Sequence, residues 1–396
     1  MFLENPPLIE VPGFRWMGTS LGIKDTSLDF GVLASDVPCS AAAVFTRSTM
    51  PGAPILVGRE HVSKGQLQAV VVNSKNANVA TGAGGIADAR EMCQGVAEAL
   101  GITPEWVLPS STGVIGRRLP MSKIREGFSR IIPELGSSTA HIESFARAIM
   151  TTDTVPKWAV GRVGTATIVA VAKGSGMIEP NMATMLSYFA TDAQIAPEVL
   201  QPLLTRVVNR SFNRVTVDSD TSTSDTVVLL ANGQAGPVGL QEFEDVFTQM
   251  ATSLARKLAR DGEGATKLIE LTVSGARSPE MALQVAKTVI NSPLVKTAIH
   301  GADPNWGRFV MAVGKVFEYP VQREDLRIYF GRGDERKVID AEGMEQGTVD
   351  LEAISELLRL EDVPIELVVG KGDFREVVWG CDLSREYVAI NADYTT

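Results

Sequence analysis

The sequence predicts a layered α/β fold, because stretches typical of buried strands alternate with stretches typical of helices. Gln68–Asn73 reads Gln-Ala-Val-Val-Val-Asn, a short apolar run of the kind found inside a sheet. Ala87–Leu100 follows as a helix, and Gly101 stands where a left-handed cap would end it. Over residues 240–260 apolar side chains recur at helical spacing, which predicts one long amphipathic helix.

The other elements follow from local signals. Ser122 can cap a helix that runs to Ile132, with Pro133 just beyond it. The run Thr165–Ala172 is typical of a strand. Ser278-Pro279-Glu280 combines a capping hydroxyl, a proline suited to the first helical position and a carboxylate facing the helix dipole, so a helix begins there. Further short strands are expected at residues 226–231, 268–274, 326–330, 365–369 and 377–379.

Composition narrows the class of protein. The chain has 396 residues, enough for one large or two medium domains, and its net charge of −10 disfavours a nucleic-acid partner. It contains no long basic run, no apolar run long enough to span a membrane, and no signal-peptide pattern at its start. Three cysteines without paired spacing fit a reducing cytoplasm and predict neither a zinc site nor a disulfide framework. We therefore expect a cytoplasmic protein without a metal or cofactor.

The segment Lys173–Leu186 carries the most specific chemistry. It contains one lysine, two glycines, a proline and Thr184, which follows the small Ala183. A threonine hydroxyl becomes a good nucleophile when its own α-amine is free to act as a base, and this requires cleavage of the Ala183–Thr184 bond. Such an amine has a pKa of roughly 7.7–8.0, and the ammonium of Lys173 would lower it. The residues alone favour the plainer alternative, a glycine turn between two core strands.

Two other polar clusters have competing interpretations. Ser110–Gly116 is either a β-turn or an oxyanion hole, in which Gly113 allows backbone N–H groups to approach and Thr112 adds a hydroxyl donor. Asp218–Asp225 is not an EF-hand, because Thr223 and Leu229 occupy the positions that require Gly and Glu. Asp218 as a covalent nucleophile has no other support in the chain, so a polar turn is the preferred interpretation.

The remaining motifs favour structure over function. Residues 82–87 match a dinucleotide fingerprint in letters, but the preceding strand ends at Asn73, too far upstream, so a loop before a helix is expected. His61, His141 and His300 lie far apart and near no paired carboxylate motif. The sequence therefore indicates neither a Ser–His–Asp triad nor a histidine metal site.

A series of sequence blocks spans nearly the whole chain: residues 76–82, 111–116, 148–154, 173–192, 218–226, 261–267, 291–297, 303–308 and 380–396. In these blocks, taken in order, the chain resembles the ornithine acetyltransferase (glutamate N-acetyltransferase) family of arginine biosynthesis, also called ArgJ. No motif position departs from the family pattern.

The resemblance implies an activity and an architecture. The fold would be the layered α/β type shared with self-processing aminopeptidases of the DmpA type. Residues 1–183 and 184–396 would be two chains of one interlocked body, paired as a heterotetramer. The enzyme would move acetyl from N2-acetylornithine to glutamate by a ping-pong route through acetyl-Thr184, and some members also use acetyl-CoA. The nearer alternative is an amidase or aminopeptidase of the same fold, and the farther one is a non-catalytic binding protein.

The resemblance also implies residue roles. Thr184 would be the nucleophile, freed by cleavage after Ala183, and Thr112 with Gly113 would form the oxyanion hole. A lysine would suit a substrate carboxylate and a glutamate would suit the ornithine ammonium. The implied substrate contacts, besides Thr184 itself, are Lys173, Glu263, Asn391, Thr396 and one threonine of the pair Thr151 and Thr152, of which Thr151 is favoured.

Overall fold

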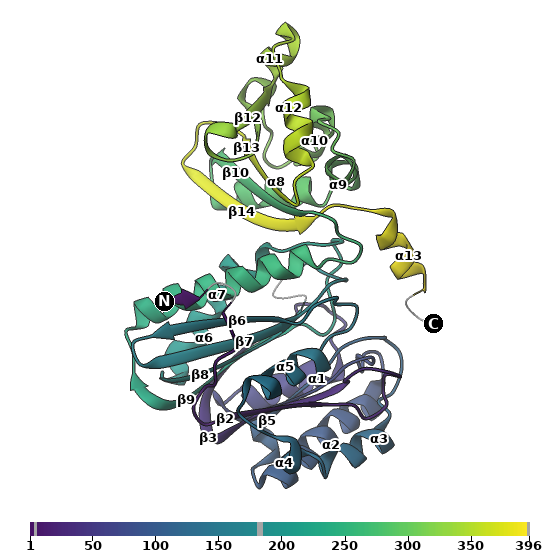
Figure 1. Ribbon diagram of the computed structural model, residues 1–396, viewed down its shortest axis with the longest axis vertical. Coiled ribbons are helices and arrows are strands. Elements are labelled where there is room, and N and C mark those ends of the chain that lie inside the picture. Colours follow the sequence, from purple (N-terminus) through teal and green to yellow (C-terminus); the bar gives the residue numbers. More distant parts are fainter. Residues whose placement is uncertain (4–5, 180–184, 394–396) are drawn as a thin grey trace. The chain divides into compact units, whose positions relative to one another are not determined.

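The structure is a computed structural model that describes residues 1–3, 6–179 and 185–393 (Figure 1). The chain divides into two compact units. Unit 1 comprises Met1–Asn213 with Asp220–Leu258, and unit 2 comprises Arg214–Ser219 with Ala259–Thr396. Each unit combines a β-sheet with helices, which confirms the expected α/β class. Among the described residues, no helix is both long enough and apolar enough to cross a membrane.

Unit 1 is built on a nine-stranded sheet in the order β1-β6-β7-β8-β9-β3-β4-β5, with β2 paired to β3. The pairs β4–β5 and β8–β9 are parallel, whereas β7–β8 and β3–β9 are antiparallel. The strands are β1 (Phe2–Leu3), β2 (Phe14–Thr19), β3 (Phe30–Phe45), β4 (Gln66–Asn73), β5 (Val107–Ser111), β6 (Lys157–Val163), β7 (Ala166–Lys173), β8 (Leu186–Gln194) and β9 (Thr226–Pro237).

The helices of unit 1 cover both faces of the sheet. They are α1 (Ala53–Val62), α2 (Gly82–Leu100), α3 (Met121–Phe128), α4 (Ile131–Glu134), α5 (Thr139–Ala148), α6 (Pro197–Arg210) and α7 (Leu240–Arg260). Successive strand residues point to opposite faces. Trp16 accordingly joins a core with Phe145 of α5, while its neighbour Met17 joins a separate core with Met92 of α2. This two-sided cover explains why β4 is buried almost throughout.

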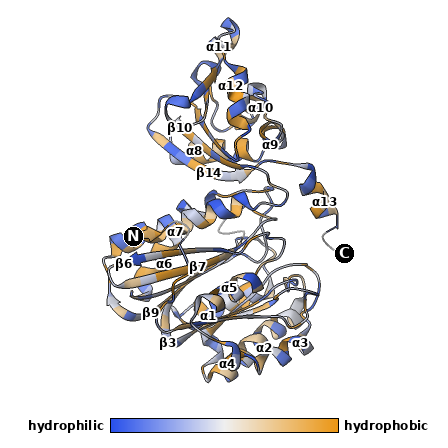
Figure 2. Cartoon of the chain, viewed as in Figure 1, coloured by the Kyte–Doolittle hydropathy of each residue, from blue (hydrophilic) through white to orange (hydrophobic). Residues whose placement is uncertain are grey.

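Helix α7 shows how the helical pattern produces packing. Its Phe247 lies edge-on to Phe189 of β8, with 4.6 Å between ring centroids. Figure 2 colours α7 both blue and orange, as expected for a helix with one buried face.

Unit 2 contains a five-stranded sheet in the order β12-β11-β13-β10-β14. The strands are β10 (Leu268–Ala276), β11 (Arg327–Phe330), β12 (Lys337–Asp340), β13 (Asp362–Val368) and β14 (Phe374–Cys381). The helices are α8 (Pro279–Ile290), α9 (Pro293–His300), α10 (Trp306–Val313), α11 (Ala341–Gln346), α12 (Leu351–Leu358) and α13 (Arg385–Asp393). Val285 and Val289 of α8 share a buried core with Leu271 and Val273 of β10.

Most of the strongest local predictions are confirmed. Gly101 ends α2 in the left-handed conformation with φ 69°, and Ser278 caps α8 by accepting a hydrogen bond from Met281 N–H at 3.2 Å. The expected continuous helix from Ser122 to Ile132 is wrong. Arg130 N–H donates a hydrogen bond to the Gly127 carbonyl, which forms a tight turn after α3. Helix α4 then begins at Ile131 as a separate helix. Residues 82–87 form the first turns of α2 and not a loop.

Candidate active site

Lys173 lies at the last residue of β7, where the segment of interest leaves the sheet. Its pairing with Leu186 is the final one in the β7–β8 register. The side chain is only 6% exposed. Ala183 and Thr184 fall within residues 180–184, outside the described residues, so the predicted cleavage site is bracketed by Glu179 and Met185.

The Lys173 ammonium lies near both the Thr112 hydroxyl and the buried carboxylate of Asp153. Its Nζ donates to Thr112 Oγ1 at 3.4 Å and lies 3.9 Å from Asp153 Oδ2. Asp153 also binds Lys157 Nζ at 2.7 Å and accepts the Gly174 N–H at 2.6 Å. Burial opposes ionisation of Asp153, but Lys157 and Lys173 outweigh it and hold the pKa of that carboxyl below its ordinary value. Asp153 therefore places a buried negative charge near the Lys173 side chain.

Sequence reasoning assigned no role to Asp153. The residue lies inside the matched block 148–154, and its spacing of four from Lys157 was a local signal that an ion pair could form.

The turn after β5 brings the backbone of Gly113 close to that of Lys75. Gly113 adopts φ 128°, and a Cβ there would lie 2.2 Å from the carbonyl carbon of Lys75, so only glycine fits. The Thr112 N–H is committed to the Asn73 carbonyl at 3.1 Å. By contrast, none of the described residues accepts a hydrogen bond from the Gly113 N–H. The available donors are therefore the Thr112 hydroxyl and the Gly113 amide.

The two candidate threonines, Thr151 and Thr152, differ in their relation to a cavity of about 410 Å³ in unit 1. Thr151 and Asp153 line it, together with Lys24, whereas Thr152 does not. The Thr151 N–H donates to Asp153 Oδ2 at 3.0 Å. Burial lowers the pKa of Lys24 to about 8, and Lys173 contributes to the same shift. Thr151 thus shares this cavity with Asp153, the carboxyl that lies near Lys173.

In unit 2, Glu263 is held by the C-terminal helix. The residue is 7% exposed, and Asn391 Nδ2 of α13 donates a hydrogen bond to Glu263 Oε2 at 2.8 Å. Gly264 permits this approach, because a Cβ there would lie 2.4 Å from Tyr387 N. Two of the predicted contacts thus form one hydrogen-bonded pair, while Thr396 lies outside the described residues.

The histidines are less isolated than their spacing indicated. His300 Nδ1 lies 2.6 Å from Asp382 Oδ2, and Thr266 Oγ1 donates to the same oxygen at 2.5 Å. Burial opposes ionisation of Asp382, but the hydrogen bonds from Thr266 and His300 lower its pKa below the ordinary value. Within the described ranges, no hydroxyl or thiol bonds the other ring nitrogen of His300. In the part of the chain that the structure describes, the pair therefore lacks the nucleophile of a Ser–His–Asp triad.

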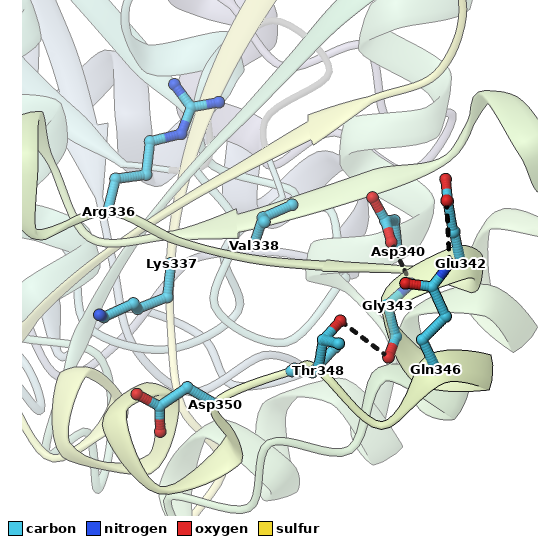
Figure 3. Close-up of a pocket in the computed structure, with 10 residues that line it drawn as sticks. Arg336, Lys337, Val338, Asp340, Glu342, Gly343, Gln346, Thr348 and Asp350 are labelled. Atoms are coloured by element: carbon cyan, nitrogen blue, oxygen red, sulfur yellow. Dashed lines mark hydrogen bonds between the residues drawn. The ribbon is translucent and has the colours of Figure 1, made fainter.

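A second cavity of about 380 Å³ in unit 2 is lined by residues of β12, of α11 and of the segment that follows α11 (Figure 3). Its polar groups bond one another, as when Gly343 N–H donates to Asp340 Oδ1 at 2.8 Å. None of the predicted site residues that the structure describes lines this cavity. Across the described residues there is also no group of three acidic, histidine or cysteine side chains that could hold a metal ion.

Comparison with known proteins gives consistent matches. A model of the ArgJ family matches residues 15–396. Arginine biosynthesis bifunctional protein ArgJ 2 of Nostoc sp. is 47% identical over 385 residues, covering 97% of each chain. Glutamate N-acetyltransferase Oat2 of Streptomyces clavuligerus is 47% identical over 386 residues, covering 97% of this chain and 98% of its own. A crystal structure of ornithine acetyltransferase from Mycobacterium tuberculosis with ornithine matches at 36% identity and TM-score 0.43, covering 46% of this chain and 99% of that one.

Proposed function

The chain belongs to the ArgJ family, and from that premise we propose that it carries acetyl from N2-acetylornithine to glutamate on the hydroxyl of Thr184. The chain is an acyltransferase of arginine biosynthesis, a glutamate N-acetyltransferase. The assignment of residues rests mainly on the contact between Lys173 and Thr112. Through this contact both side chains lie at the start of the segment that contains Thr184.

Self-cleavage between Ala183 and Thr184 generates the catalytic base. The Thr184 hydroxyl attacks the Ala183 carbonyl, and water hydrolyses the resulting ester, which leaves a free α-amine on Thr184. A cut there would leave the sheet of unit 1 assembled. Strands β8 and β9 of the second piece lie between β7 and β3 of the first, and their hydrogen bonds do not depend on the cleaved peptide.

Acetyl transfer then takes two steps. The Thr184 amine removes the proton from the hydroxyl, which attacks the acetyl carbonyl of N2-acetylornithine and releases ornithine. The Thr112 hydroxyl and the Gly113 N–H stabilise the oxyanion. Glutamate's amine next attacks the acetyl ester, giving N-acetylglutamate. One amide replaces another, so the reaction needs neither ATP nor a metal ion, and water must be kept from the ester.

Charge complementarity supports the substrate contacts. Lys173, with Thr151, would bind a substrate carboxylate, and Glu263 would bind the ornithine ammonium, with Asn391 orienting its carboxylate. We assign Thr396 to the same group on the family resemblance alone.

Replacement of Glu263 tests this assignment. Glu263→Gln keeps a polar side chain that Asn391 can bond but removes the charge. We expect KM for N2-acetylornithine to rise at least tenfold, because a hydrogen bond to a charged group contributes about 1.5–3 kcal/mol. Cleavage of the chain should continue. Asp303→Asn is the control, since that loop carboxylate is exposed. Unchanged kinetics in Glu263→Gln would remove Glu263 from the site.

The assay that tests the function measures ornithine release from N2-acetylornithine with and without glutamate. A transferase releases ornithine continuously only when glutamate is present. An amidase or aminopeptidase of the same fold would release it at an equal rate in buffer, because water completes its reaction. With acetyl-CoA as the donor in place of N2-acetylornithine, release of free CoA in the presence of glutamate tests the second donor.

Assembly and location complete the proposal. We expect the two pieces to pair as a heterotetramer, which sedimentation of the purified enzyme would measure. A cytoplasmic location fits the three cysteines, which are buried and free of disulfides.

A further inference from the structure

The cavity of about 410 Å³ in unit 1 has a cation in its wall to which the proposed function gives no role. This cation is Lys24, whose ammonium donates to the Leu28 carbonyl at 2.9 Å and to the Met150 carbonyl at 2.7 Å. Leu28 and Met150 also line the cavity, so the two hydrogen bonds hold the Lys24 ammonium at its wall. An ammonium has three N–H groups, and one of them remains for a ligand.

A buried carboxylate fixes the loop that carries Lys24. Asp29 is fully buried, and its Oδ1 accepts the backbone N–H of Leu21 at 2.8 Å. Its Oδ2 accepts the backbone N–H groups of Ile23 at 2.7 Å and of Lys24 at 2.9 Å. Both oxygens of Asp29 thus bond the backbone, and this shapes the loop so that the Lys24 side chain reaches the cavity.

The other charged groups that line the cavity already have partners of opposite charge. Arg147 donates to Glu143 Oε1 from Nε at 3.0 Å and from Nη2 at 2.6 Å. Asp153 forms its ion pair with Lys157 at 2.7 Å. Among the described residues, Lys24 is therefore the cation of this cavity that bonds backbone carbonyls and no carboxylate.

The electrostatics of the cavity favour a bound anion. The pKa of Lys24 is lowered to about 8, mainly by burial and also by the ammonium groups of Lys173 and Lys75, against the fields of Asp29 and Asp153. At pH 7 the side chain is still mostly charged, because this pH lies below its pKa. A carboxylate bound in the cavity would therefore provide a counter-ion to a partly desolvated ammonium.

The two substrates of the proposed function differ in the charge of their side chains. N2-acetylornithine carries one carboxylate and one ammonium, whereas glutamate carries two carboxylates. Lys173 with Thr151 is assigned to one carboxylate, so the second carboxylate of glutamate requires another cation. Thr151 lines the cavity, and so does Asp153, whose Oδ2 lies 3.9 Å from Lys173 Nζ. The cavity of Lys24 thus adjoins the position assigned to the first carboxylate.

We propose that this cavity is a carboxylate subsite in which Lys24 binds the side-chain carboxylate of glutamate, an assignment that rests on the proposed function. The Lys24 ammonium donates its third N–H to the carboxylate, and the hydroxyls of Thr26 and Ser27 in the cavity lining add further donors. Lys24 thereby selects the acetyl acceptor and does not bind the acetyl donor.

Lys24→Gln removes the charge but keeps an amide that can donate to one of the two carbonyls. In a ping-pong reaction, kcat/KM for each substrate reports its own half-reaction, so donor and acceptor are measured separately. We expect kcat/KM for glutamate to fall about tenfold or more, because a hydrogen bond between charged groups is lost. The value for N2-acetylornithine should stay close to that of wild type, which also shows that the variant is folded.

Lys64→Gln is the matched control, because this exposed lysine changes the net charge equally and does not line the cavity. It should leave both values of kcat/KM unchanged. An unchanged value for glutamate in Lys24→Gln would overturn the proposal. Equal losses for glutamate and N2-acetylornithine would also overturn it, because Lys24 would then serve a group that both substrates share.

Glutamine as the acceptor gives a second measurement, which needs no variant. It has an amide in place of the second carboxylate, so wild-type enzyme should use it with a kcat/KM about tenfold or more below that for glutamate. Equal use of the two acceptors would overturn the subsite. Failure of the proposed function itself would look different, because wild-type enzyme would then release ornithine no faster with glutamate than without it.

Discussion

The Thr184→Ala variant is expected to remain one uncut chain of 396 residues and to show no measurable acetyl transfer. The side chain it loses has two tasks, attack on the Ala183 carbonyl and attack on the substrate, and no second hydroxyl is assigned to either. Intact-mass analysis and the ornithine-release assay check the two losses separately. Wild-type protein should yield a fragment that begins at Thr184.

Thr184→Ser is the matched control for this experiment. Serine keeps the hydroxyl but lacks the methyl group that restricts the χ1 rotamer. We expect it to cleave into residues 1–183 and 184–396, more slowly than wild type. Wild-type enzyme that transfers acetyl groups while remaining whole would show that another group, and not the Thr184 amine, is the base.

The second large effect is expected at Thr112. Removal of one oxyanion-hole donor typically lowers turnover by about 10²–10³-fold. Its backbone N–H is committed to the Asn73 carbonyl, so the hydroxyl is the donor that Thr112→Ala would remove. Steady-state kinetics on fully cleaved enzyme would measure the loss in kcat. A decrease of less than a few-fold would leave only Gly113 in this role.

Ser111→Ala controls for damage to the same turn. The Ser111 hydroxyl is buried and donates to Asn73 Oδ1 at 2.6 Å. Its removal should lower the free energy of unfolding by about 1–3 kcal/mol, since Asn73 Oδ1 loses a buried donor. We expect kcat to stay close to that of wild type, in contrast to Thr112→Ala.

Local patterns predicted the elements whose signals lie within a few residues. The helical spacing over residues 240–260 and the Ser278 cap are examples, because side chains three or four positions apart determine them. The break between α3 and α4 was not predicted. The turn at Gly127 depends on one backbone hydrogen bond that the apolar spacing does not encode.

In the candidate site, the contacts between residues far apart in the sequence could not be predicted. Lys173 and Thr112 stand 61 positions apart, and their contact depends on the strand order of the sheet. The pairing of His300 with Asp382, 82 positions away, was not predicted for the same reason. The individual roles of Thr184, Glu263 and Thr396 came from family resemblance and remain predictions, whereas the pairing of Glu263 with Asn391 is seen in the structure.

The position of β8 and β9 inside the sheet of unit 1 has a consequence for folding. Before the cut, strand pairing between β7 and β8 is a local event on one chain, which costs little loop-closure entropy. After the proposed cut, the same pairing would join two molecules, so refolding from denaturant would become second order in protein concentration. The proposed cleavage thus predicts that the chain folds before it is cut, and that cleaved enzyme unfolded in dilute solution would regain its structure only as fast as its two pieces meet.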